Sequence, residues 1–131
     1  MRMLVDGDAA GEALVLDETL SFWGGLDPDT GQIIGRHPQQ GRSVTGRLLV
    51  MPGGRGSSSS SSVLAEALRR GTGPAAIVLG EPDEIITLGA IVAAELYGTV
   101  CPVVVLHPGT DILEDGMRLQ VRAGEARLLI G

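Results

Sequence analysis

The chain has 131 residues and a formal net charge of −6, with 44% hydrophobic but only 2% aromatic residues. This length is typical of one domain, so we expect a single domain over residues 1–131 with an aliphatic core. An acidic chain with few aromatic residues argues against nucleic-acid binding, because phosphates need a basic surface and bases need stacking platforms.

The amino-terminal pattern favours a cytoplasmic protein. Acidic residues and glycines interrupt residues 1–16, which argues against a signal peptide. No apolar run approaches the roughly 20 residues that a membrane span needs. The single cysteine, Cys101, lies in an apolar run and is expected to be a buried small side chain. One thiol can form neither an internal disulfide nor an iron–sulfur site, so we expect this chain to bind no metal and no cofactor.

In the first part of the chain, the pattern predicts short strands and one loop. Met3–Val5 and Glu12–Leu16 are strand candidates. Ser21–Gly31 is rich in glycines and acids, as in an ordered loop. A short strand is predicted at Gln32–Ile34. The run Arg47–Met51 is apolar almost throughout, as in a strand covered on both faces.

The second part alternates between strands and helices. A helix is predicted to end at Arg70, because arginines occupy its last turn and Gly71 follows. The other expected elements are a strand at 75–79, a helix at 84–97 with an apolar face of Ile85, Leu88, Val92 and Leu96, strands at 102–106, 117–123 and 126–130, and a short strand at 111–113. Strand–helix–strand units imply parallel strands with right-handed crossovers. We therefore expect an α/β fold, a compact β/β/α domain with helices packed on a mixed sheet or an open barrel.

The junction after Met51 carries the most distinctive chemistry. Gly53-Gly54-Arg55-Gly56 leads into six serines, Ser57–Ser62, that open the predicted helix. Glycines let a backbone approach a ligand, and the first amides of a helix attract anions. Arg55 can bind a carboxylate or phosphate through two hydrogen bonds. The pattern indicates an anion-binding turn. Two alternatives are a low-complexity linker and a helix start in which one serine caps the helix and the other serines have no specific role.

Several other polar or aromatic residues have simple structural interpretations. Trp23 either fills the core or anchors an interface. Asp27 is expected to bond its own backbone in a turn. His37 and His107 precede prolines and show no metal-ligand spacing. The acids before the second helix are expected to cap it, and they are Glu81, Asp83 and Glu84.

Blocks along nearly the whole chain resemble the small subunit of the aconitase X family. They are Ser21–Gly31, His37-Pro38, Gly41–Val44, Gly53–Ser58, Gly73–Val78 and Leu88–Leu96. The resemblance implies a swivelling β/β/α domain, like the mobile fourth domain of aconitase. It also implies a large catalytic subunit that carries an iron–sulfur cluster and shares the active site with this chain, in a heterodimer or higher assembly.

The same resemblance implies a hydro-lyase that dehydrates a hydroxy acid. Ser57, directly after Gly-Arg-Gly, corresponds to the family's proton acceptor, and its neighbour Ser58 is the second candidate. Ser57 would remove the proton next to the substrate carboxylate, while the partner's metal site takes the leaving hydroxyl. The expected substrate is cis-3-hydroxy-L-proline or a related hydroxy acid, with phosphomevalonate as the alternative. The expected substrate-binding residues are Gly54, Arg55, Gly56, Ser58, Ser21, Gly24 and Gly25.

Two functions of other classes stay open from the residues themselves. One is a non-catalytic anion-binding or regulatory domain that uses the same glycine–serine turn. The other is a structural dimerisation domain, in which Arg55 and Ser57 could be exchanged freely.

Overall fold

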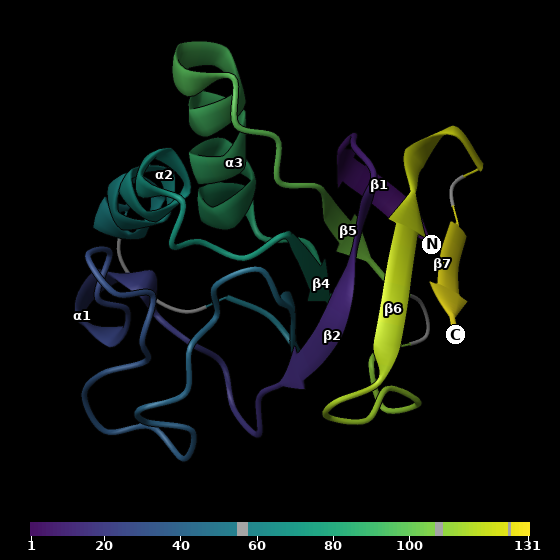
Figure 1. Ribbon diagram of the computed structural model, residues 1–131, viewed down its shortest axis with the longest axis horizontal. Helices are drawn as coiled ribbons and strands as arrows, with labels where there is room; N and C mark the ends of the chain where they lie inside the picture. Colours follow the sequence, from purple (N-terminus) through teal and green to yellow (C-terminus); the bar gives the residue numbers. More distant parts are fainter. Residues whose placement is uncertain (55–57, 107–108, 126) are drawn as a thin grey trace.

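The computed structural model describes residues 1–54, 58–106, 109–125 and 127–131. Its centre is a seven-stranded sheet in the order β1-β5-β4-β3-β2-β6-β7, which curls into a half-barrel (Figure 1). The strands are Arg2–Val5 (β1), Ala9–Val15 (β2), Leu48–Met51 (β3), Ala76–Leu79 (β4), Val103–Val105 (β5), Arg118–Arg122 (β6) and Arg127–Ile130 (β7).

The four central strands run parallel, and antiparallel strands complete both edges of the sheet. β2, β3, β4 and β5 pair in parallel in that order. β1 lies antiparallel to β5, while β6 lies antiparallel to β2 and pairs with β7. The expected mixed sheet is therefore confirmed. Because the central strands are parallel, their carboxyl ends share one edge, which is where open α/β sheets bind ligands.

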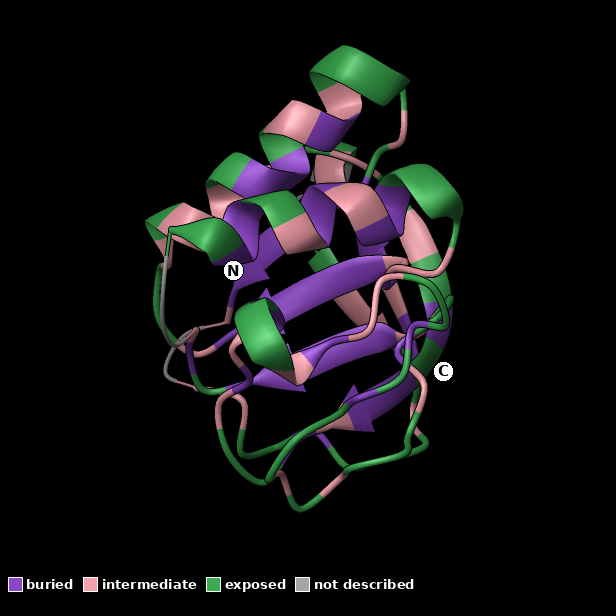
Figure 2. Cartoon of the chain, turned by 90° about the vertical axis from the view of Figure 1, so that its left-hand side faces the viewer, coloured by how far each residue is buried: buried purple, intermediate pink, exposed green. Residues whose placement is uncertain are grey.

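Two helices cover one face of this sheet. α2 (Ser59–Arg70) follows β3, and α3 (Glu84–Tyr97) follows β4. Figure 2 shows the buried strands beneath the two helices and the exposed outer faces of the helices. None of the described helices combines the length and apolarity that a membrane span requires.

The sheet separates two apolar cores. In β3, Leu49 and Met51 join the core under the helices, while Leu48 and Val50 join the core on the opposite face. All four side chains are fully buried, as predicted for a strand covered on both faces. The second core also contains β6 residues such as Val121, so the curl of the sheet closes this core.

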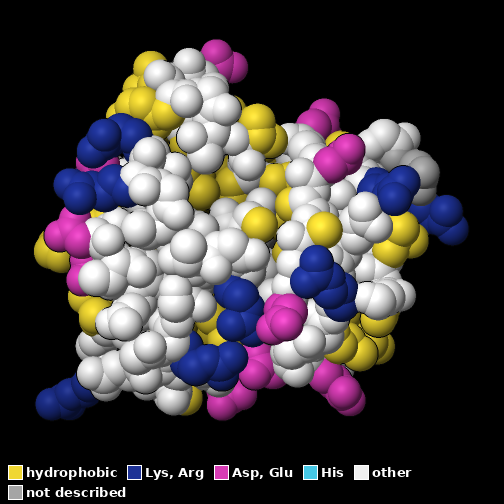
Figure 3. All heavy atoms as spheres, in the orientation of Figure 1, with side chains coloured by type: hydrophobic (Ala, Val, Ile, Leu, Met, Phe, Trp, Pro, Cys, Tyr) yellow, Lys and Arg dark blue, Asp and Glu magenta, His cyan; other side chains and the backbone are white. Residues whose placement is uncertain are grey.

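The apolar face predicted for α3 is only partly right: Ile85 and Val92 are partly buried, and Val92 packs against the core, but the other two members are exposed. Leu88 is 52% exposed and Leu96 is 69% exposed, and Figure 3 shows hydrophobic side chains at the upper end of this helix. The buried face consists instead of Ile86, Gly89, Ala90 and Ala93. A Cβ on Gly89 would lie 2.9 Å from the Ser61 carbonyl oxygen of α2. At Gly89 the two helices approach so closely that a side chain would meet the α2 backbone, so small residues occupy this part of the interface beside Ile86.

The loop predicted at 21–31 contains one short turn, α1 (Phe22–Gly25), in which Trp23 and Gly24 have non-helical backbone angles and Gly24 has a φ of 79°. Two short segments differ from prediction. Residues 32–34 form isolated bridges, Leu26 with Ile33 and Gln32 with Ser43, instead of a strand. Residues 110–113 form a turn closed by the Leu113 amide on the Thr110 carbonyl at 3.0 Å. Among the described residues, neither segment is one of the seven strands of the sheet.

Candidate functional site

The residues after β2 and β3 meet at the carboxyl edge of the parallel strands. Leu20 forms an isolated parallel bridge with Gly54, so Ser21 lies beside the glycine pair that leaves β3. Helix α2 begins at Ser59, a short distance along the chain from that pair. Three segments singled out in the sequence are thus brought to one edge of the sheet: the loop at 21–31, the glycine pair and the start of the serine-rich helix.

The space around Gly53 and Gly54 is taken by acidic side chains of the loop that follows β4. A Cβ on Gly53 would lie 2.8 Å from Glu81 Oε1. A Cβ on Gly54 would lie 2.7 Å from Asp83 Cγ and 2.8 Å from Ile86 Cδ1. A side chain at Gly54 would thus require Asp83 and Ile86 to move, whereas at Gly53 the exposed Glu81 side chain could give way. The sequence suggested only the approach of a ligand.

The serine run divides into buried and exposed members. Ser60 and Ser61 are buried, and the Ser61 hydroxyl donates to the Ile85 carbonyl at 2.8 Å. Ser58 is exposed, occupies the N-cap position of α2 and makes no side-chain capping bond. Because the run contains packed helical residues, the low-complexity linker was the wrong alternative.

A buried hydroxyl joins α2 to the loop at 21–31. Ser60 Oγ accepts a hydrogen bond from the Trp23 amide at 3.1 Å and lies 3.4 Å from Ser21 Oγ. Ser21 Oγ also donates to the Trp23 carbonyl at 3.1 Å. Phe22 is fully buried, but the Trp23 side chain is 55% exposed. Trp23 is therefore not a core residue, which leaves the interface interpretation.

Beside this contact lies a shallow hollow of about 190 Å³. Its lining includes three of the predicted substrate-binding residues, Ser21, Gly24 and Gly25. The remaining lining residues, which were not among the predicted ones, include Glu18, Trp23, Arg36 and His37. Pockets that hold small ligands usually measure about 300–1,000 Å³. The hollow is smaller than that.

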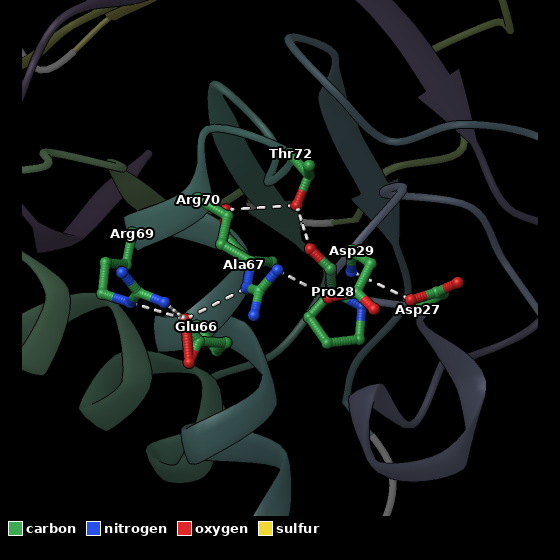
Figure 4. Close-up of polar contacts among 8 residues, drawn as sticks. All are labelled: Asp27, Pro28, Asp29, Glu66, Ala67, Arg69, Arg70 and Thr72. Carbon is green, nitrogen blue, oxygen red and sulfur yellow. Dashed lines mark hydrogen bonds and ion pairs between the residues drawn. The ribbon is translucent and has the colours of Figure 1, made fainter.

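The opposite end of α2 holds the far end of the same loop (Figure 4). Arg70 Nη1 lies 2.7 Å from Asp29 Oδ1, and the Thr72 hydroxyl donates to the Pro28 carbonyl at 2.6 Å. Asp27 Oδ1 accepts from the Asp29 amide at 2.9 Å, which confirms the predicted turn. The loop is thus fastened at both ends of one helix.

The central residues of the predicted site, Arg55, Gly56 and Ser57, lie outside the described residues, as does His107. His37 has a structural role, because its Nδ1 accepts from the Gln39 amide at 3.0 Å and its Nε2 lies 3.3 Å from the Glu18 carbonyl. Asp83 caps α3 as predicted, with Oδ1 accepting from the Ile86 amide at 2.9 Å.

The described residues do not fit a metal or an iron–sulfur cluster. No three His, Cys, Asp or Glu side chains gather in the described part of the chain. Cys101 is fully buried, and this burial raises the pKa of its thiol to about 12. A thiol with so high a pKa stays protonated at neutral pH, whereas metal binding requires the thiolate.

Three contacts were not apparent from the sequence: the Ser60 hydrogen bond, the place of Arg36 in the hollow and the position of Asp83 beside Gly54. Ser60 stands among five identical neighbours, so nothing local distinguishes it. Arg36 lies in a loop without a motif, and only the fold brings it to the hollow. Asp83 was recognised as a cap, but its contact with Gly54 depends on tertiary structure.

Solved structures share this curled mixed sheet with its helices. The crystal structure of Thermococcus kodakaraensis aconitase X in its holo-form matches with a TM-score of 0.88 and 33% identity, covering 99% of this chain and 95% of that one. A solution NMR structure of a UPF0107 protein matches with a TM-score of 0.86 and 36% identity, covering 99% of this chain and 96% of that one.

The chain belongs to the aconitase X swivel domain family, whose model matches residues 1–130. This confirms the resemblance found in the sequence. The chain is 56% identical to the cis-3-hydroxy-L-proline dehydratase of Pseudomonas aeruginosa, over 86% of this chain but 20% of that protein. It is 40% identical to the phosphomevalonate dehydratase small subunit of Methanothermobacter thermautotrophicus, over 97% of this chain and 95% of that protein. It thus spans a fifth of the first relative and nearly all of the second.

Proposed function

We propose that this chain is the swivel part of an aconitase-X-type hydro-lyase and supplies the base that removes a proton from a hydroxy acid. The observation that carries the proposal is the 56% identity to a named dehydratase across 86% of the chain. The hollow at the carboxyl edge supports it, because Ser21, Gly24 and Gly25 line that hollow beside the start of α2.

The proposed partner is a larger catalytic polypeptide, in a heterodimer or higher assembly. The domain corresponds to 20% of the Pseudomonas aeruginosa dehydratase and to 95% of the Methanothermobacter small subunit. One fold thus matches a part of a long chain and a separate small subunit. The exposed Trp23 side chain borders the hollow, and tryptophan is enriched among residues that anchor interfaces. We place any iron–sulfur cluster on the partner.

In the proposed reaction, Ser57 takes the proton from the carbon next to the substrate carboxylate. The electron pair of the broken C–H bond forms the new double bond, and the hydroxyl group leaves from the neighbouring carbon. A neutral serine hydroxyl is a poor base, and its basic alkoxide is scarce at neutral pH unless the anion is stabilised. The positive end of the α2 dipole and nearby backbone amides would stabilise such an anion. Arg55 would bind the substrate carboxylate.

The proposed substrate is cis-3-hydroxy-L-proline or a close relative. The identity to the dehydratase of that name is 56%, against 40% for the phosphomevalonate dehydratase small subunit. Phosphomevalonate stays the second candidate, because the chain matches those small subunits over almost their full length.

The test is co-purification with the encoded large polypeptide, followed by a substrate screen of the complex. We expect loss of water from cis-3-hydroxy-L-proline, monitored by NMR of the product, and no turnover by this chain without its partner. If the complex turns over phosphomevalonate but not cis-3-hydroxy-L-proline, phosphomevalonate becomes the assigned substrate. Two results would favour a non-catalytic anion-binding domain instead. One is a stable complex that is inactive on both substrates, and the other is anion binding by the isolated chain without a partner.

A further inference from the structure

Asp83 faces two neighbours with its two carboxylate oxygens. It lies between β4 and α3, where Oδ1 accepts the Ile86 amide at 2.9 Å and caps the helix. Oδ2 is the atom nearest to the position that a Cβ on Gly54 would occupy. The Asp83 backbone is fixed as well, because its carbonyl accepts the Thr87 hydroxyl at 2.7 Å.

Gly54 is held between this carboxylate and the segment that follows β2. On one side it bridges Leu20, and on the other it packs against Asp83 and Ile86. The loops after β3 and β4 are also joined directly, since the Gly80 amide donates to the Pro52 carbonyl at 3.0 Å. Gly54 is therefore held on both sides at the last described residue before Ser58.

We propose that Asp83 is a positioning residue: its carboxylate braces Gly54, three residues before Ser57 in the sequence, and so limits where Ser57 can lie. The inference rests on the proposed function of Ser57 as the base. Capping alone does not explain an aspartate here, because serine caps a helix about equally well. Of the two carboxylate oxygens, one serves the cap and the other reaches Gly54.

The test separates capping from bracing. Asp83→Ser keeps a capping oxygen but removes the atom that packs on Gly54. We expect a melting temperature close to wild type, with kcat of the complex lowered about tenfold to a hundredfold, because small misplacements of reacting groups have effects of this size. KM should change little, since substrate contacts are retained. Asp83→Asn, which keeps the shape of the side chain, should retain most of the turnover.

Glu84→Gln is the matched control. It removes one negative charge from the first turn of α3, close to the charge that Asp83→Ser removes, but Glu84 is not among the nearest neighbours of Gly54. We expect Glu84→Gln to keep wild-type kcat. Equal losses in both variants would assign the effect to charge and overturn the bracing role.

A second measurement does not depend on activity. Backbone order parameters from NMR relaxation of the full chain should fall at Gly54 and Ser58 in Asp83→Ser but not in Glu84→Gln. If the wild-type complex is inactive, the proposed function fails while this measurement still decides the bracing role. Unchanged order parameters in Asp83→Ser would overturn it.

Discussion

The two ends of helix α2 are held by different interactions. Ion pairs and a glycine cap stabilise the carboxyl end, whereas uncharged serine hydroxyl groups make the contacts at the amino end. Arg69 and Arg70 pair with Glu66, and Gly71 ends the helix with a φ of 80°. At the other end, Ser60 bonds the Trp23 amide from a buried position, while Ser58 stays exposed.

The difference separates a structural end from the end at which we propose function. The charged end ties the helix to the loop at 27–29 through contacts on the surface. The neutral end leaves the positive pole of the helix dipole beside the hollow, without an acidic residue in the first turn of α2 to offset it. An anionic substrate would meet that pole, so changes at this end should affect chemistry more than changes at the charged end.

The largest expected effect is that of Ser57→Ala, at the neutral end. Removing a general base usually lowers turnover about 10²–10⁴-fold. The complex should still assemble, and Ser62→Ala, an exposed member of the same run, should keep full activity. Steady-state kinetics of the reconstituted complex measures both. Near-wild-type turnover by Ser57→Ala would refute the assignment, and a selective loss in Ser58→Ala would move it to Ser58.

The second effect is on folding, again at the neutral end. Ser60→Ala leaves the Trp23 amide without its hydroxyl acceptor in a partly buried site. Losing one partner of such a hydrogen bond costs about 1–3 kcal/mol. Ser62→Ala, at an exposed position, should change the free energy of unfolding by less than about 0.5 kcal/mol. Urea denaturation of both variants gives the comparison, and equal stabilities would mean that Ser60 does not fasten the loop.

A third effect concerns association. Trp23→Ala should leave the unfolding free energy nearly unchanged, because the side chain is 55% exposed. Loss of an interface anchor should weaken binding to the partner about tenfold or more. Leu96→Ala, which removes another exposed apolar side chain, is the control for calorimetric titration. Equal affinities for Trp23→Ala and wild type would place the interface elsewhere.

Features of the molecule that depend on local sequence patterns could be predicted from the sequence. The charged end of α2 was predictable, because two arginines followed by glycine form a local stop pattern. The buried strands were predictable from apolar runs, and the meeting of Ser21 with Gly54 follows from the shared edge of parallel strands.

What the sequence could not predict depends on contacts between distant segments. Six consecutive serines are chemically identical, and only the fold buries Ser60 and Ser61 while leaving Ser62 exposed. In α3, apolar residues occur on several faces, so periodicity could not select the small-residue face around Gly89 that packs on α2. Likewise, Phe22 is buried whereas its neighbour Trp23 is exposed, and the sequence does not distinguish them.

The smallest expected effect lies at the charged end and depends on pH. The hydrogen bond from Arg69 lowers the pKa of Glu66 below its ordinary value of 4.5, and the charges of both arginines act in the same direction. A pKa lowered by folding contributes stability above the unfolded-state value, and this contribution is lost as pH falls through the folded-state value. Glu66→Gln should therefore be less stable than wild type near neutral pH, and the difference should disappear in acid. Because the pair is exposed, the difference should also shrink in high salt. Denaturation curves of both variants at the two pH values test this, and a difference that persists in acid would have to come from packing, not from charge.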